Sequence, residues 1–310
     1  MEIIHGTHNI KPEHYGNVIT MGNFDGVHRG HQMLLEHLSA KSAELGVPSL
    51  LITFEPQPRE FFAGESVPPR LTRLREKVVL LQRTGLDRLL LLPFNDVTAR
   101  TPALWITEQL FHERLGAKYV VVGDDFRFGR DRAGDFALIQ SSGERLGYGV
   151  SNTGTLSVGD ERISSSRIRQ ALTASDFATA TDLLGHEYFI MGRVVYGRQL
   201  GRQLGVPTAN IRLQRYKAAL NGVYCVKTEG IDERTYESIA NIGVRPTVDG
   251  KEPLLEVHIF DFDRDIYGDL LSVTFKQKLR DEQTFASIDI LKSQIERDIV
   301  RAKDWFKVNE

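Results

Sequence analysis

A ten-residue string at positions 22–31, G-N-F-D-G-V-H-R-G-H, constrains the fold of this chain more than any other feature. It follows a short apolar run at 18–21 and precedes a segment, 32–45, whose apolar residues recur at helical spacing. The string therefore predicts a buried strand, a glycine-containing turn and the start of a helix. At the carboxyl edge of an α/β sheet such a turn commonly binds nucleotides. Its backbone N–H groups and the helix dipole favour phosphate there.

Two histidines, His28 and His31, flank Gly30 at the start of the predicted helix. Imidazoles at this position can donate to phosphate oxygens whose charge grows during nucleotidyl transfer. One alternative is an ordinary glycine turn with two surface histidines. Another is a zinc site, which needs a third ligand in a suitable pattern, and none stands out nearby.

The composition limits the kinds of protein that this chain can be. The chain has 310 residues, enough for two domains, and 41% of them are hydrophobic. A formal net charge of -2 argues against a general nucleic-acid or membrane surface. The single cysteine, Cys225, permits no intramolecular disulfide. Without a membrane-spanning run or a signal peptide, the expected location is cytoplasmic; the sequence leaves open whether the chain forms a homo-oligomer.

Strand-like and helix-like segments alternate through the first half of the chain. The runs at 49–54, 88–92 and 118–123 are apolar and strand-like, and helical spacing covers 71–83 and 102–115. Thr101 is the expected cap of the last helix, with Pro102 at its first position. This alternation predicts a parallel, doubly wound, Rossmann-like sheet. Continuously apolar strands fit a sheet that is covered on both faces.

The pattern changes after a predicted helix at 173–184. Short β-runs then follow one another with few helices between them, at 188–195, 222–227, 238–242, 254–260 and 271–275. This spacing predicts a small antiparallel β-barrel. An amphipathic helix near the end, from Ile288 to Phe306, is expected to pack on it. The sequence thus predicts an α/β domain over 1–185 and a mainly β domain over 186–310.

Several other polar segments carry possible chemistry, each with a simpler alternative. The loop at 123–129 follows a buried strand and could contact a base or flavin, but its spacing alone favours a solvated loop with an aromatic plug. The serine run at 164–166 is a good helix start. Three glycines at 197, 201 and 205 permit close approach of a ligand, although a flexible β-loop has the same pattern. Glu256 and His258 share one side of a predicted strand.

Taken together, these segments resemble the bacterial bifunctional riboflavin kinase/FMN adenylyltransferase (FAD synthetase) family. The string at 22–31 is similar to the family's H-x-G-H nucleotidyltransferase signature. Residues 121–129 resemble V-V-G-x-D-F-R-F-G, and 163–169 resemble I-S-S-T-x-I-R with Ser166 in place of threonine. Residues 197–210 resemble G-R-x-L-G-F-P-T-A-N with Val206 in place of phenylalanine, and 241–247 resemble N-I-G-x-R-P-T. The motifs span both halves in the expected order.

For the first half, the resemblance implies an enzyme that transfers AMP from ATP to FMN, giving FAD and pyrophosphate. It implies catalytic roles for His28, His31, Ser164 and Arg167, with arginine binding phosphate through its fixed fork of donors. The implied ATP-binding residues are Gly22, Asn23, Phe24, Gly30 and Ser165. The implied flavin-binding residues are Phe54, Pro56, Asp125, Phe126 and Phe128.

For the second half, the resemblance implies a kinase that phosphorylates riboflavin to FMN with ATP and Mg²⁺. Glu256 aligns with the family's catalytic glutamate and would accept the proton of the attacking ribityl hydroxyl. Thr208 and Asn210 would bind Mg²⁺ through hard oxygen atoms. The implied phosphate-binding residues are Gly197, Gly201 and Gly205, and Arg245 would contact the flavin. No nucleic acid or membrane partner is expected.

Two other functions remain open at this point. In one, the first domain adenylylates or cytidylylates a different acceptor and the barrel is a flavin-binding regulatory module. In the other, the histidines bind a metal in a hydrolase.

Overall fold

The fold of the chain is that of a computed structural model, which describes residues 1–154, 157–158, 161–197, 201, 205–247 and 250–309, without the side chains at 65, 158, 244–247 and 250–252. The chain forms two compact units. The first contains Met1–Val67 and Thr72–Ser164, and the second contains Pro68–Leu71 and the chain from Ser165 onward. Within the described ranges, no helix combines the length and apolar character needed to cross a bilayer.

The first unit is built on a six-stranded, wholly parallel sheet. Its strands lie in the order β1-β4-β3-β2-β5-β6. They are β1 (Glu2–His5), β2 (Asn17–Met21), β3 (Ser49–Glu55), β4 (Arg88–Pro93), β5 (Ala117–Gly123) and β6 (Gly149–Thr153). The strand order reverses beside β2, so the predicted turn at 22–31 leaves the sheet where α/β folds commonly bind ligands.

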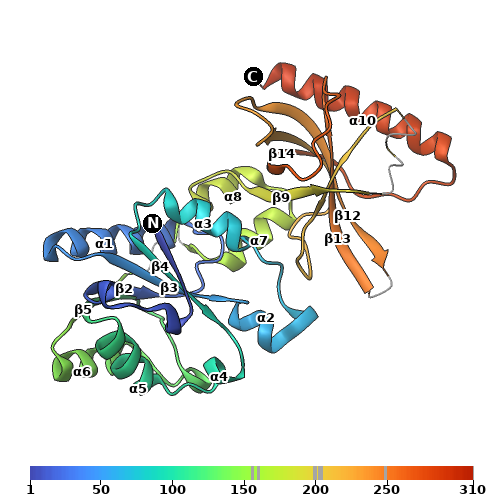
Figure 1. The fold of residues 1–310 in the computed structure, drawn as a ribbon. Helices are drawn as coiled ribbons and strands as arrows, with labels where there is room; N and C mark the ends of the chain where they lie inside the picture. The colour runs from blue at the N-terminus through green and yellow to red at the C-terminus, as the bar shows by residue number, and fades with distance from the viewer. Residues whose placement is uncertain (155–156, 159–160, 198–200, 202–204, 248–249, 310) are drawn as a thin grey trace. The chain divides into compact units, whose positions relative to one another are not determined.

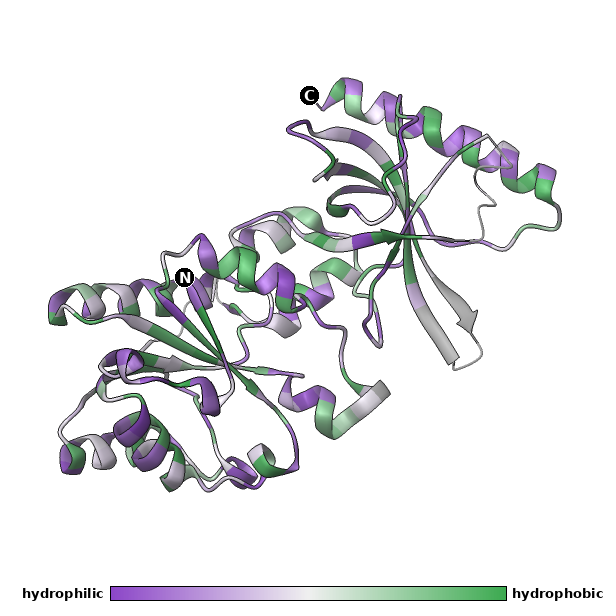
Figure 2. Cartoon of the chain, in the orientation of Figure 1, coloured by the Kyte–Doolittle hydropathy of each residue, from purple (hydrophilic) through white to green (hydrophobic). Residues whose placement is uncertain are grey.

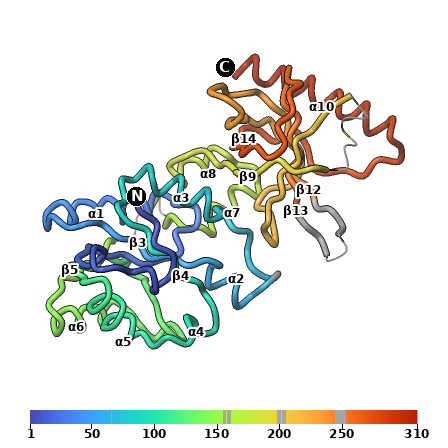
Figure 3. Tube along the Cα trace, in the orientation of Figure 1, coloured from blue at the N-terminus to red at the C-terminus, as the bar shows by residue number. Residues whose placement is uncertain are grey.

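Helices cover both faces of this sheet (Figure 1 and Figure 3). The longer ones are α1 (Arg29–Leu45), α3 (Leu74–Gln82), the π-helical η4 (Ile106–Arg114) and α6 (Phe136–Leu146). The shorter helical segments are η1 (Thr7–Asn9), η2 (Pro12–His14), α2 (Pro58–Ala63), η3 (Gly64–Ser66), α4 (Asp96–Ala99), α5 (Ala103–Trp105) and η5 (Arg130–Arg132). A two-stranded hairpin, β7 (Ser157–Val158) with β8 (Glu161–Arg162), precedes the second unit. The doubly wound architecture is confirmed.

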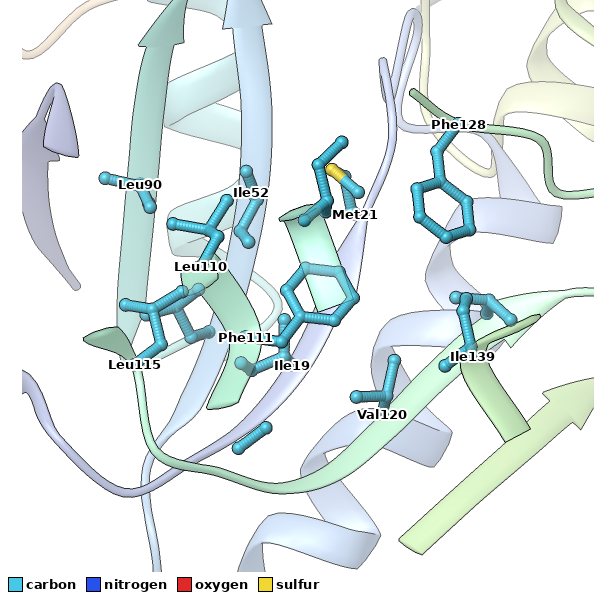
Figure 4. Packing of buried hydrophobic residues seen from close by; sticks show 14 of the residues in the cluster. Ile19, Met21, Ile52, Leu90, Leu110, Phe111, Leu115, Val120, Phe128 and Ile139 are labelled. Atoms are coloured by element: carbon cyan, nitrogen blue, oxygen red, sulfur yellow. The ribbon is translucent and has the colours of Figure 1, made fainter. Parts of the chain in front are cut away.

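A large apolar cluster fills one side of the sheet. Ile19, Ile52 and Leu90 from neighbouring strands pack against Phe111 of η4, as Figure 4 shows. The strands that carry these residues are mostly hydrophobic along their length (Figure 2). Such continuous apolar strands are buried on both faces, which explains why their sequence runs lack alternation.

Two predictions for the first unit are corrected by the structure. Thr101 does not cap the helix at 102–115, because Pro102 is itself the extended N-cap residue of α5. The Thr101 hydroxyl instead donates to the Val97 carbonyl at 2.9 Å. The edge strands β1 and β6 were also not predicted. Only Ile4 is buried in β1, and β6 is a half-polar segment, G-V-S-N-T, so neither gives a clear apolar run.

The second unit contains a closed six-stranded barrel, as predicted. Its strands pair in the order β10-β13-β12-β11-β14-β9, and all pairs are antiparallel. They are β9 (Phe189–Val195), β10 (Ala209–Arg212), β11 (Gly222–Glu229), β12 (Tyr236–Thr247), β13 (Gly250–Ile259) and β14 (Leu270–Arg280). Strand β10 was not predicted, because its four residues, A-N-I-R, are too few to show alternation.

Two short helices precede the barrel, where the sequence predicted a helix start at 164–166 and a helix over 173–184. They are α7 (Ser165–Thr173) and α8 (Phe177–Leu184). The break lies at Ser175, whose φ of +58° is outside the helical region. The Asp176 carboxylate then caps α8 by accepting from the Thr179 N–H at 3.0 Å. Both helices belong to the second compact unit, which therefore begins earlier than position 186.

The C-terminal helix α10 (Ile288–Val308) packs on the outside of the barrel. Ala302 and Phe306 contact Val223, Cys225 and Ile239, which form one buried cluster. Polar and apolar residues alternate along this helix in Figure 2. The predicted amphipathic helix is confirmed, and its apolar face is the one that meets the barrel.

A buried ion pair also joins α10 to the barrel. Asp298, only 1% exposed, accepts from Arg280 Nε of β14 at 2.8 Å and from Gln294 Nε2 at 2.8 Å. Removing one partner of such a pair leaves the other charge poorly compensated.

We expect Asp298→Ala to lower the free energy of unfolding of the barrel unit by about 3 kcal/mol. A urea titration followed by Trp305 fluorescence in a Trp105→Phe background measures it. Asp304→Ala is the control, because Asp304 pairs with Lys307 at an exposed surface of the same helix and should cost under about 1 kcal/mol. Equal losses in the two variants would contradict a special role for the Asp298 pair.

Candidate active sites

The turn between β2 and α1 adopts an unusual backbone. Phe24, Gly26 and Val27 have φ values of +48°, +88° and +42°. Positive φ is easy for glycine but is a clear outlier for a β-branched residue such as Val27. Strained residues of this kind persist only where the surrounding structure holds them, and they gather at functional sites.

The segment that leads into α3 holds this turn. The Gly26 N–H donates to Thr72 Oγ1 at 2.9 Å, and the Thr72 N–H donates to Asp25 Oδ1 at 3.0 Å. Asp25 and Thr72 are both buried. These reciprocal bonds fix the middle of the turn against a neighbouring element.

The two predicted histidines lie together where α1 begins. His28 is the N-cap residue, and its Nδ1 accepts from the His31 backbone N–H at 3.4 Å. Their rings stack with centroids 3.6 Å apart, and Phe24 stacks on His31 at 4.6 Å. A Cβ on Gly30 would lie 3.3 Å from the His28 ring, so glycine leaves the room that this stack needs. Because Nδ1 of His28 acts as an acceptor, its proton resides on Nε2, which can donate to a ligand.

The surroundings of His31 favour its neutral form. Burial lowers the pKa of His31 well below its usual value, and the charges of His28 and Lys77 lower it further. Nδ1 of His31 is buried without a hydrogen-bond partner among the described residues. A neutral imidazole can donate one hydrogen bond to an incoming phosphate and can gain a proton as negative charge builds up.

The predicted flavin residues of the first unit lie at the carboxyl ends of β3 and β5. Phe54 contacts Phe94 edge-on at 5.6 Å, and Pro56 follows β3. Asp125 pairs with Arg162 at 2.9 Å, and the hydrogen bond from Arg162 lowers the pKa of Asp125.

Phe126 and Phe128 of this group differ in burial. Their rings stack at 5.3 Å. Phe128 is 6% exposed and belongs to the core cluster, where Figure 4 places it near Met21. Packing therefore accounts for Phe128, whereas Phe126 is only partly buried against the same cluster.

The serine motif divides between the two units. Ser164 ends the first, whereas Ser165 and Arg167 lie in the first turn of α7. The sequence prediction named Arg167 but not Arg169. In the pattern I-S-S-T-x-I-R, however, the final arginine falls at position 169. Within the second unit, Arg169 and Ser166 line an open cavity of about 530 Å³ together with Pro68, Pro69, Gln170, Thr173 and Ala174.

The barrel brings three polar residues of adjacent strands into register. Asn210 of β10 lies directly opposite Glu256 of β13, which in turn lies opposite Asn241 of β12. Residues opposite each other on neighbouring strands share a face and have Cβ atoms about 5 Å apart. This is the outer face, because Asn241 also pairs with Val223, which packs against α10. Asn241 was not among the predicted site residues, since the sequence predicts the strands but not which residues lie opposite each other in the barrel.

Two glycines make room for the predicted metal-binding side chains. A Cβ on Gly197 would lie 2.6 Å from the Asn210 amide, and one on Gly201 would lie 3.1 Å from Thr208 Oγ1. Asn210 is 5% exposed, and its Nδ2 donates to the Thr208 carbonyl at 3.3 Å. That bond turns the amide oxygen away from the Thr208 carbonyl.

A histidine fixes the segment just before Thr208. His258 Nδ1 donates to the Pro207 carbonyl at 2.8 Å, and burial lowers the pKa of His258. His258 is two residues from Glu256 on the same face of β13. Gly205 has a φ of +80°. Residues 198–200 and 202–204 lie outside the described residues, and so does the side chain of Arg245 on β12.

Two family matches each cover one of the two folds of the chain. The FAD synthetase family matches residues 10–167, and the riboflavin kinase family matches residues 184–306. The first range covers the parallel sheet with its histidine turn, and the second covers the barrel with α10.

Full-length relatives carry both activities in their names. A protein of Pseudomonas fluorescens is 47% identical over 305 residues, covering 98% of this chain and 97% of the relative. One of Escherichia coli K12 is 45% identical over 307 residues, covering 99% and 98%. Both are named bifunctional riboflavin kinase/FMN adenylyltransferase. The barrel match contradicts a purely regulatory barrel, and the paired activities contradict the hydrolase.

A solved structure supports the fold. A crystal structure from Streptococcus pneumoniae, described as a macrolide-efflux protein, superposes with a TM-score of 0.81 at 30% identity, over 98% of this chain and 100% of its own. The family matches, the full-length relatives and the two folds agree. This chain belongs to the bifunctional riboflavin kinase/FMN adenylyltransferase family, with an N-terminal FMN adenylyltransferase and a C-terminal riboflavin kinase.

Proposed function

We propose that Glu256 is the general base of the riboflavin kinase. The observation that supports this most strongly is its register opposite Asn210 on the outer face of the barrel. A carboxylate at this place would accept the proton of the riboflavin ribityl hydroxyl as that oxygen attacks the γ-phosphate of ATP. Because phosphoryl transfer depends mostly on positioning, the neighbouring polar residues would orient Glu256 and the phosphates.

Thr208 and Asn210 are the proposed protein ligands of Mg²⁺. A hydroxyl and an amide oxygen are hard donors, and Mg²⁺ in kinases commonly takes one or two protein oxygens beside phosphate and water. The space left by Gly197 and Gly201 beside these two side chains fits that role. When bound, the metal would neutralise charge on the ATP phosphates.

Gly197→Ala tests this assignment. Its Cβ would displace the Asn210 amide, so the Mg²⁺ concentration for half-maximal riboflavin phosphorylation should rise about tenfold. Gly192→Ala is the control for crowding in the barrel, since its Cβ would lie 2.4 Å from the Ile211 side chain and Gly192 has no proposed contact with Mg²⁺ or phosphate. An unchanged Mg²⁺ requirement in Gly197→Ala, or the same rise in both variants, would count against Asn210 as a ligand.

For the adenylyltransferase, the proposed catalytic residues are His28 and His31. FMN already carries an anionic phosphate, so its attack on the α-phosphate of ATP needs no strong base. The two imidazoles would donate to phosphate oxygens that gain charge as pyrophosphate leaves. Gly22, Asn23, Phe24 and Gly30 form the backbone of the same turn and would bind ATP there.

Other residues have supporting roles in this proposal. Ser164, Ser165 and Arg167 remain proposed phosphate ligands, and Arg169 is added because it occupies the arginine position of the motif. Phe54, Pro56, Asp125 and Phe126 would contact the flavin, with Phe128 holding Phe126 from the core. Arg245 is a proposed flavin contact of the kinase on sequence resemblance alone.

The remaining proposals concern the setting of the enzyme. We propose a functional boundary near 185/186, which the start of the riboflavin kinase match at 184 supports. A cytoplasmic location, the absence of nucleic-acid and membrane partners, and a homo-oligomer as an open possibility stay predictions from the sequence. The names of the two activities of the family imply riboflavin, FMN and ATP as substrates.

A further inference from the structure

A lysine is completely buried beneath the histidine turn. Lys77 of α3 is 0% exposed. Its Nζ donates to the Asn23 carbonyl at 2.5 Å and to Thr53 Oγ1 at 3.4 Å. Burying an ammonium group is costly unless polar partners surround it, and most lysines on a helix of this length reach solvent. The position of Lys77 therefore requires a reason beyond packing.

The partners of Lys77 lie at the ligand edge of the sheet. Asn23 is the second residue after β2, and Thr53 lies near the carboxyl end of β3. Thr53 Oγ1 is itself 3.4 Å from the Asn23 carbonyl, so the three groups form one small network. The ammonium is thus placed directly behind the turn that is proposed to bind ATP.

The bond to Asn23 determines which way the next peptide N–H points. In a trans peptide, the carbonyl of one residue and the N–H of the following residue point in opposite directions. Since the Asn23 carbonyl points at Lys77, the N–H of Phe24 points away from it. Phe24 is one of the residues with positive φ, so this orientation must be maintained against backbone strain.

The charge of Lys77 also reaches the catalytic histidine. Lys77 is one of the causes that lower the pKa of His31, after burial and His28. A fixed cation behind a phosphate site adds favourable electrostatic potential without the reorganisation that water would need.

We infer that Lys77 is a positioning residue of the adenylyltransferase: it holds the Asn23 carbonyl so that the Phe24 N–H faces a phosphate of ATP, and it supplies a buried positive charge behind that phosphate. This inference rests on the proposed function of the turn in AMP transfer. It extends that site to a third element, α3, which also holds the turn through the segment at Thr72.

The test compares Lys77→Met, Lys77→Gln and Lys77→Arg in the full-length protein. With FMN and ATP as substrates, we expect Lys77→Met to lower kcat/KM for ATP about 100-fold, with a raised KM for ATP and an unchanged KM for FMN. Lys77→Gln keeps a hydrogen-bond donor but removes the charge, so its kcat/KM for ATP should lie between those of Lys77→Met and wild type. If Lys77→Met does not fold, Lys77→Gln provides the test. Lys77→Arg keeps the charge and should recover most of the activity.

Two controls separate positioning from stability. Leu80→Ala removes a buried side chain from the same helix and should lower the melting temperature without changing KM for ATP. By NMR, the His31 imidazole should titrate at higher pH in Lys77→Gln than in wild type, because the charge of Lys77 lowers the pKa of His31. Riboflavin phosphorylation should be unchanged in every variant.

Three results would overturn the inference. They are wild-type ATP kinetics in Lys77→Met and Lys77→Gln, equal loss in all three Lys77 variants, or the same rise in KM for ATP in Leu80→Ala. His31→Ala distinguishes this failure from failure of the proposed function. If His31→Ala loses FAD synthesis and the Lys77 variants keep it, only the role of Lys77 is wrong; if His31→Ala also keeps it, the assignment of the turn is wrong.

Discussion

Glu256→Gln is expected to lower the kcat for riboflavin phosphorylation about 1,000-fold, because general-base removal typically costs 10²–10⁴ in rate. Glutamine keeps the size and polarity of the side chain, so the pairing with Asn210 and Asn241 across β10, β13 and β12 should survive. FAD formation from added FMN should continue at the wild-type rate, since it belongs to the other domain. The measurement is a steady-state assay of each half-reaction with purified variant.

Glu237→Gln is the matched control for this variant. Like Glu256→Gln, it removes one negative charge. Glu237 lies on β12, four residues from Asn241 and on the same face of that strand. The Glu237→Gln variant should phosphorylate riboflavin normally. Comparable kinase activity in Glu256→Gln and wild type would exclude Glu256 as the base, and equal loss in both glutamine variants would point to a general effect of charge on the barrel.

The second large effect is expected from the histidine turn. His28→Ala and His31→Ala should each lower the rate of FAD formation from FMN by about 10²–10³, the usual cost of losing one preorganised donor to a developing charge. FMN formation from riboflavin should be spared. The two losses should not add fully, because the rings stack at 3.6 Å and each variant disturbs the other ring.

The control for the turn is His37→Ala on the same helix. His37 lies near Ser151 Oγ, at 3.3 Å, and has no proposed contact with substrate. It should form FAD at the normal rate. If His28→Ala and His31→Ala also form FAD normally, or if they lose both reactions while still folded, the assignment of separate sites would be wrong.

The sequence predicted the histidine turn well because its signals are local. An apolar run, a glycine-rich turn and helical spacing follow one another within 28 residues from 18 to 45, and the structure has β2, the turn and α1 there. The presence of an antiparallel β-barrel was also predictable, since its longer strands each contain enough residues to show a β pattern. The edge strands β1 and β6 were missed because an edge strand needs few buried residues.

The site contacts were less predictable because they depend on strand pairing and on distant residues. Asn210 lies on β10, which is too short to recognise, and its register with Glu256 exists only once the barrel closes. Lys77 is 54 positions from Asn23, and a lysine in an amphipathic helix is normally expected in solvent. Arg169 was not predicted, although the spacing of the motif alone places its arginine at this position.

Mixing two variants tests whether one chain contains two independent active sites. Riboflavin, ATP and Mg²⁺ are incubated with Glu256→Gln, with His31→Ala, or with both proteins together, and the flavins are separated by chromatography. We predict unchanged riboflavin with the first, FMN alone with the second, and FAD with the mixture. Failure of the mixture to form FAD, although each variant keeps its remaining half-reaction, would contradict two sites that act independently.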